Sequence, residues 1–146
     1  MPLYHIVPSV VFLLALPGCG EVPHRSEIEI VATDYAFQVP TKIKPGLVAF
    51  RFVNHGTVPH EVQFYHLRPR IPRDSALRRL TTELPDSLAV DGAGSVLWAP
   101  AGVTTQDRLL VDVRAGQVYL LMCQFQNADS LPPHSKLGMI AVVESE

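Results

Sequence analysis

The stretch "YLLMCQFQNADSLPPHSKLGM", residues 119–139, joins an apolar run to a loop that carries sulfur and nitrogen side chains. The apolar run ends at Cys123, and His134 and Met139 follow it before the next apolar segment begins. Packing alone does not require a thiol, an imidazole and a thioether in this order. Two apolar runs joined by one loop predict neighbouring strands, with the loop at one end of the sheet.

The other apolar runs are short, rich in valine and separated by proline and glycine turns. The chain has 146 residues, of which 13 are proline, and 47% are hydrophobic. This length fits one domain with a sizeable core, and frequent proline disfavours helices. We therefore predict an all-β sandwich of about seven short strands. The clearest are residues 27–39, 47–54, 61–67, 104–113, 117–125 and 138–144.

Alternation within these runs predicts which side chains share a face of the sheet. In the apolar run that begins the opening stretch, Met122 should point away from Cys123 and occupy a core position. In residues 27–39 the alternation changes phase near Thr33 and Asp34. This change predicts a bulge or kink within one strand.

Residues 68–95 do not fit the strand pattern and are predicted to be an insertion. Asp74 is expected to be an N-cap, and Pro85 to end the helix that follows it. Leucines recur at helical spacing between them, which predicts one short amphipathic helix: Leu77, Leu80 and Leu84. The arginines of the insertion are expected to form a solvated face, with docking to an acidic redox partner or anionic headgroups as the alternative.

The N-terminal segment is expected to be a targeting signal rather than part of the fold. Residues 6–16, "IVPSVVFLLAL", form an apolar run of 11, too short to span a bilayer and typical of a signal peptide. The residues "LPGC", 16–19, resemble the lipobox of bacterial lipoproteins, in which the cysteine is lipidated. We therefore expect a signal peptide (1–18), a lipidated N-terminus and tether (19–26) and one domain (27–146).

This organisation predicts a lipoprotein on the periplasmic face of a bacterial membrane, anchored through Cys19. An ordinary signal peptide with an incidental Cys19 would instead give a soluble periplasmic protein. Lipidation of Cys19 leaves Cys123 as the single thiol of the mature domain, and an unpaired cysteine in an exported protein needs an explanation. Cys123 could form a disulfide with Cys19, pair with a cysteine of another molecule, lie inert in the core or bind a metal.

The candidate metal ligands are two imidazoles, one thiolate and one thioether: His60, Cys123, His134 and Met139. This soft set suits copper, which is held by two histidines and a cysteine in one plane with a weak axial methionine. His60 opens a strand and is expected to reach the end of the sandwich where the others lie. His55, in the preceding turn, is a rival, whereas His66 lies roughly 20 Å from His60 along the same strand. Each of these residues also has a purely structural interpretation, as a core or solvated side chain.

The segments "NHGTVPHEV" (54–62), "YLLMCQF" (119–125) and "PPHSKLGM" (132–139) resemble the cupredoxins, the blue copper domains. The resemblance covers residues 27–144 apart from the insertion, and is to exported cupredoxin-like lipoproteins with a long Cys-to-His loop. It implies a Greek-key β-sandwich that transfers single electrons between larger redox partner proteins. It also implies that a mononuclear type 1 copper ion is bound by His60, Cys123, His134 and Met139.

The resemblance also implies roles for Asn54 and His134, and the sequence departs from the family pattern in the length of one loop. An asparagine near the first histidine often ties the two ligand loops together in this family, a role implied for Asn54. His134 is expected nearest to the surface, where the electron would leave. Ten residues separate Cys123 from His134, more than in familiar blue copper loops. A longer loop constrains the positions of Cys123 and His134 relative to each other less tightly.

The sequence is therefore compatible with three functions: an electron carrier, a copper carrier or sensor of the cell envelope, and a metal-free module with the same fold. The sequence contains no nucleophile motif and no paired carboxylates at catalytic spacing, so we do not expect the protein to be an enzyme. The net charge of −2 predicts no basic surface for nucleic acid. We expect the domain to act as a monomer.

Overall fold

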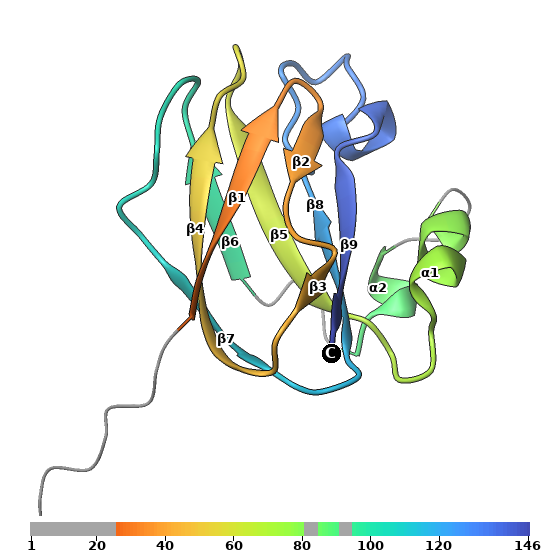
Figure 1. The fold of residues 1–146 in the computed structure, drawn as a ribbon. Helices are drawn as coiled ribbons and strands as arrows, with labels where there is room; N and C mark the ends of the chain where they lie inside the picture. Colours follow the sequence, from red (N-terminus) through yellow and green to blue (C-terminus); the bar gives the residue numbers. More distant parts are fainter. Residues whose placement is uncertain (1–25, 81–84, 91–94) are drawn as a thin grey trace, which may run out of the picture.

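Two β-sheets face each other and enclose the main hydrophobic core (Figure 1). The computed structural model describes residues 26–80, 85–90 and 95–146. One sheet has the strand order β2-β1-β4-β7 and contains Ala36–Gln38, Ser26–Thr33, Gly46–Asn54 and Leu109–Val113. The other has the order β3-β9-β8-β5-β6 and contains Lys42–Ile43, Ile140–Ser145, Val118–Met122, His60–His66 and Ser95–Ala99. The predicted β-sandwich is confirmed.

The chain crosses between the sheets in a Greek-key arrangement. After β4 in the first sheet, β5 and β6 lie in the second, β7 returns to the first, and β8 and β9 complete the second. β1 pairs in parallel with β4, and β3 pairs in parallel with β9. The described part of the chain has nine strands rather than about seven, because β2 and β3 are only three and two residues long. The sequence pattern predicted neither β3 nor β6.

The chain reverses direction between β1 and β2, so the predicted kink within one strand is wrong. Thr33 pairs with Ala36 in an antiparallel register, which leaves Asp34 and Tyr35 as the turn of a hairpin. Asp is common in turns because its side chain can accept hydrogen bonds from nearby backbone. The phase change in the sequence marks this turn. The turn lies at the end of the sandwich that also carries the segment between β8 and β9 (Figure 1).

Strand β8 is buried on both faces, which explains its continuous apolar sequence. Tyr119, Leu121 and the adjoining Cys123 belong to the core between the sheets. Leu120 and Met122 belong to a second cluster, on the outer face beneath the inserted segment. Met122 therefore occupies a core position on the side opposite to Cys123, as predicted.

The inserted segment contains two short helices that lie beside the second sheet, α1 (Arg73–Arg79) and α2 (Pro85–Leu88) (Figure 1). Pro72 rather than Asp74 is the N-cap of α1, and Asp74 lies in its first turn. Pro85 begins α2, since proline is favoured in the first turn of a helix. Leu80 packs in the outer cluster as its spacing predicted. Leu84 lies outside the described residues, as do the expected signal peptide and Cys19.

Among the described residues, no helix has the length and apolar character needed to cross a membrane.

Candidate metal centre

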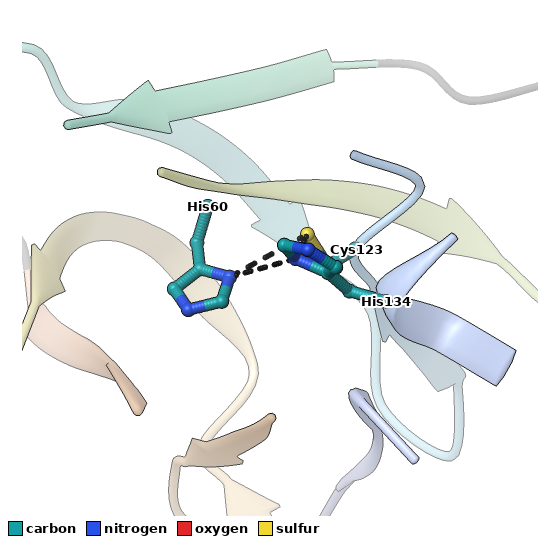
Figure 2. Close-up of side chains that lie close together, drawn as sticks. All are labelled: His60, Cys123 and His134. Carbon is teal, nitrogen blue, oxygen red and sulfur yellow. Dashed lines mark hydrogen bonds between the residues drawn. The ribbon is translucent and has the colours of Figure 1, made fainter. Parts of the chain in front are cut away.

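Three of the predicted ligands meet at one end of the sandwich, and Figure 2 shows their side chains converging. The Nδ1 atoms of His60 and His134 are 3.0 Å apart. The Sγ atom of Cys123 lies 3.5 Å from Nδ1 of His134 and 4.0 Å from Nδ1 of His60. All three residues are buried, and their ligand atoms lie within 4.8 Å of one another. His60 begins β5, Cys123 directly follows β8, and His134 begins a 3₁₀ helix, His134–Leu137.

Backbone hydrogen bonds close the long segment between Cys123 and His134. The amide of His134 donates to the carbonyl of Phe125 at 2.9 Å, and the amide of Ser135 donates to the carbonyl of Cys123 at 2.7 Å. The intervening residues 126–132 are exposed. The ten residues between Cys123 and His134 thus form a loop whose two ends are held together. The length of this loop therefore does not separate the thiol from the imidazole.

Met139 is fully buried beside these residues and is linked to both of them by its backbone. Its amide donates to the carbonyl of His134 at 3.1 Å, and its carbonyl accepts from the amide of Cys123 at 3.2 Å. Gly138 caps the 3₁₀ helix with a φ of 104°, a left-handed conformation that glycine adopts without steric cost. This turn brings the chain from His134 back towards the strand end of Cys123.

Asp34 contacts the site and was missed by the sequence interpretation. Its Oδ1 atom lies 2.9 Å from Nε2 of His60, the ring nitrogen that faces away from the other two ligands. The amide and hydroxyl of Thr57 donate to Oδ2 of Asp34 at 2.9 and 2.6 Å. The hydroxyl hydrogen bond from Thr57 is the largest cause that lowers the pKa of Asp34, from 3.8 to about 2. The phase change at Thr33 and Asp34 is the signal in the sequence, but it predicts a bulge or kink rather than the turn that carries Asp34.

Asn54 holds the turn before His60 rather than joining the two ligand loops. Its buried Nδ2 donates to the carbonyls of Val58, Ala99 and Pro100 at 2.9–3.1 Å. Its Oδ1 accepts from the amide of Gly56 at 2.8 Å. These hydrogen bonds connect the turn to the end of β6. The family resemblance instead implied that Asn54 bonds to the loop that carries Cys123 and His134.

Aromatic rings cover His134, which is buried like the other two ligands. Its place as the ligand nearest to the surface stays a prediction, since the exposed fractions of His60, Cys123 and His134 differ by only 1%. Only 1% of its surface is exposed. The rings of Tyr35 and Phe125 lie with centroids 4.7 and 5.6 Å from its imidazole. Its Nε2 atom is buried and has no hydrogen-bond partner among the described residues. Burial, followed by the nearby imidazole of His60, lowers the pKa of His134.

Cys123 is a free, fully buried thiol in this structure. Burial raises its pKa above the ordinary 9.0, because a thiolate loses solvation there. The backbone amide of Glu61 points at Sγ from 3.4 Å and opposes this effect by favouring the thiolate. A cation close to the sulfur would therefore be needed to keep it ionised at neutral pH.

The rival histidines do not enter the site. His55 and His66 are both exposed. The imidazole of His66 instead packs against the ring of Tyr119, with centroids 5.1 Å apart. In the part of the chain that the structure describes, the one group of three or more candidate metal-binding side chains is His60, Cys123 and His134.

The separations within this group fit a single bound ion. Imidazole nitrogen at about 2.0 Å and thiolate sulfur at about 2.3 Å from one ion, at trigonal angles, would be about 3.5–3.7 Å from each other. The observed separations of 3.0, 3.5 and 4.0 Å bracket these values. The residues present can hold a metal that prefers nitrogen and sulfur, with only small adjustments of the side chains.

Known structures share the fold of this chain. An auracyanin from the photosynthetic bacterium Roseiflexus castenholzii, crystallised in a dithionite-reduced state, is 16% identical with a TM-score of 0.54, over 83% of this chain and 97% of the auracyanin. Auracyanin B is 18% identical with a TM-score of 0.51, over 88% of this chain and 93% of its own.

A chain of a heme-copper terminal oxidase dimer is 16% identical with a TM-score of 0.51, over 84% of this chain and 64% of that chain. No protein-family model and no curated protein matches the chain. At sequence identities of 16–18%, the similarity to these proteins concerns the fold alone.

Proposed function

We propose that this chain, which has the cupredoxin fold, binds one copper ion through His60, Cys123 and His134 and carries single electrons. The observation that carries this proposal is the convergence of two imidazole nitrogens and one thiol, all from buried residues, within 4.8 Å of one another. Two imidazoles, a thiolate and a weak thioether are the ligand set of copper electron-transfer sites. Met139, buried and bonded through its backbone to both neighbours, supplies the thioether.

The surroundings of the site suit electron transfer because they hold the ligands in place. Bound copper would supply a one-electron couple between Cu(I) and Cu(II). His60 is fixed by Asp34, and His134 by its backbone bond to Phe125 and the ring of Tyr35. Ligands that cannot rearrange keep the same geometry in both oxidation states. Burial of all three ligands also keeps water from the ion.

A copper carrier of the cell envelope is the second candidate function. The exposed residues 126–132 between two ligands favour it, because opening this segment would release His134. The backbone bonds that join the ends of the segment oppose opening. The two functions differ in how firmly the reduced site retains its metal.

The apolar run 6–16 and the "LPGC" that follows support export and attachment to the membrane through a lipid on Cys19. The protein would then act as a monomer on the periplasmic face and exchange electrons with a redox partner protein. Incorporation of labelled palmitate, with Cys19→Ala as the control, tests this placement. Equal labelling of both chains, or labelling of neither, would contradict it.

A redox cycle tests the proposed function. The purified full-length chain is loaded with one equivalent of Cu(II), reduced with dithionite, exposed to a Cu(I) chelator and then reoxidised. An electron carrier keeps its copper and recovers its initial visible spectrum over repeated cycles. Loss of copper to the chelator within the first cycle would favour the copper carrier, and failure to take up copper would contradict both.

A further inference from the structure

Asp34 approaches the copper ligand His60 from the side opposite to the other ligands. It lies in the turn of the β1–β2 hairpin, 26 positions from His60 in sequence. Its carboxylate accepts from both donors of Thr57 and contacts Nε2 of His60 at 2.9 Å. His60 is fully buried, whereas 26% of the Asp34 side chain is exposed. The carboxylate thus fills the space between the histidine and the solvent.

This contact determines which nitrogen of His60 carries the proton. A carboxylate only accepts hydrogen bonds, so Nε2 must be the donor. In the neutral imidazole the other nitrogen, Nδ1, then has a free lone pair. Nδ1 is the atom that faces Cys123 and His134. Carboxylates that accept from the second nitrogen of a metal-binding histidine fix its tautomer and orientation and make it a stronger ligand.

Gly56 leaves the space that this contact needs. A Cβ atom at this position would come within 2.8 Å of Nε2 of His60 and would overlap Oδ1 of Asp34. Gly56 itself is held by Asn54, which accepts a hydrogen bond from its amide. The turn before His60 is therefore shaped around the contact between the carboxylate and the imidazole.

We propose that Asp34 is a positioning residue that orients the metal-binding nitrogen of His60 and whose negative charge lowers the reduction potential of the bound copper. This proposal rests on the proposed copper site. Negative charge next to a ligand stabilises Cu(II) more than Cu(I), because Cu(II) carries the greater positive charge. The carboxylate contacts the ligand directly, 2.9 Å from Nε2 of His60, so its effect on the ion should exceed that of a carboxylate on a distant strand.

Three full-length variants separate the effect of charge from that of the hydrogen bond. Asp34→Asn keeps an acceptor oxygen and removes the charge, and Asp34→Ala removes both. Asp112→Asn is the matched control, because it makes the same change in net charge on the exposed face of β7, where Asp112 pairs with Leu47 of β4. Copper content, copper affinity and reduction potential are measured for each.

We expect Asp34→Asn to raise the reduction potential clearly more than Asp112→Asn while retaining one copper per chain. We expect Asp34→Ala to bind copper about 10–100-fold more weakly than the unmodified chain. Equal potentials for Asp34→Asn and Asp112→Asn would overturn the role of the charge. Failure of the unmodified chain to bind copper would instead overturn the proposed function, so the two failures are distinguishable.

A measurement on the unmodified, metal-free chain keeps the positioning role testable even if the Asp34 variants do not fold. Long-range proton–nitrogen spectra at neutral pH report which ring nitrogen of His60 is protonated. We expect the proton on Nε2. A proton on Nδ1 would overturn the positioning role.

Discussion

The Nδ1 atoms of His60 and His134 lie 3.0 Å apart in the interior, although the residues are 74 positions apart in sequence. Asp34 keeps the proton of His60 on the opposite nitrogen, so Nδ1 of His60 offers a lone pair. In the metal-free chain, a proton on Nδ1 of His134 would be donated to this lone pair, and a bound cation would take the place of that proton. The buried pair, with the Cys123 thiol beside it, is therefore arranged to receive a cation.

Copper binding should release close to one proton per chain at pH 7.5. Burial raises the pKa of the Cys123 thiol, so the thiol is protonated at this pH and loses its proton to become a ligand. The lowered pKa of His134 means that this residue is already neutral and contributes none. The apparent affinity should then fall about tenfold for each pH unit from 8 to 7.

Calorimetric titration with Cu(II) in two buffers of different ionisation enthalpy gives the number of released protons. Release near zero would mean that the thiol is not a ligand or that it is already ionised in the metal-free chain. Either result contradicts the assigned role of the buried thiol.

Substitution of Tyr35 should open the cover over His134. Tyr35→Ala removes the ring that lies 4.7 Å from the imidazole, so we expect a water-soluble chelator to remove copper several-fold faster. Tyr35→Phe keeps the ring and serves as the control, with a rate close to that of the unmodified chain. Stopped-flow loss of the copper absorption measures both rates. Equal rates for the two variants would show that this ring does not protect the site.

Gly56→Ala should weaken the site through Asp34 and His60. The added methyl group overlaps the carboxylate and crowds Nε2 of the imidazole, so we expect about tenfold weaker copper binding. In an Asp34→Ala background the carboxylate is absent, and the same substitution should cost less. Copper affinities of the four chains form a double-mutant cycle. Purely additive effects would contradict the proposed overlap with Asp34.

Asn54→Ala should destabilise the fold more than it alters the copper spectrum. The substitution leaves three buried or partly buried carbonyls and one amide without their partner, at a cost of about 2–4 kcal/mol. Asn127→Ala, on the exposed segment, is the control and should change stability by less than about 0.5 kcal/mol. Urea unfolding of the metal-free chains measures the difference. A loss as small as that of the control would mean that Asn54 does not hold the turn.

The strands and the ligand set could be predicted because each leaves a local pattern. Alternation predicted that Met122 and Cys123 point to opposite sides of the sheet, and the two residues lie in different core clusters. Thiol, imidazole and thioether are uncommon enough in one loop that their order indicated a metal site. The structure brings His60, Cys123 and His134 together, as that order suggested.

The missed features depend on contacts between distant segments. Asp34 lies in a hairpin turn that sequence alone could not distinguish from a bulge, and its contact with His60 exists only once the sheets have formed. The burial of His134 was missed because Tyr35 covers it from the same hairpin. The effect of the ten-residue spacing was also missed, because backbone bonds between Phe125 and His134 leave no signature in side-chain types.

The visible absorption and electron paramagnetic resonance spectra of the full-length chain with one equivalent of Cu(II) show whether Cys123 binds copper as a thiolate. Cys123→Ser is the control, since it replaces the thiol with a hydroxyl of similar shape. We expect an intense thiolate-to-copper band and a type 1 resonance signal in the unmodified chain, and neither in Cys123→Ser. Absence of the band, or the same band in both chains, would contradict a copper site built on Cys123.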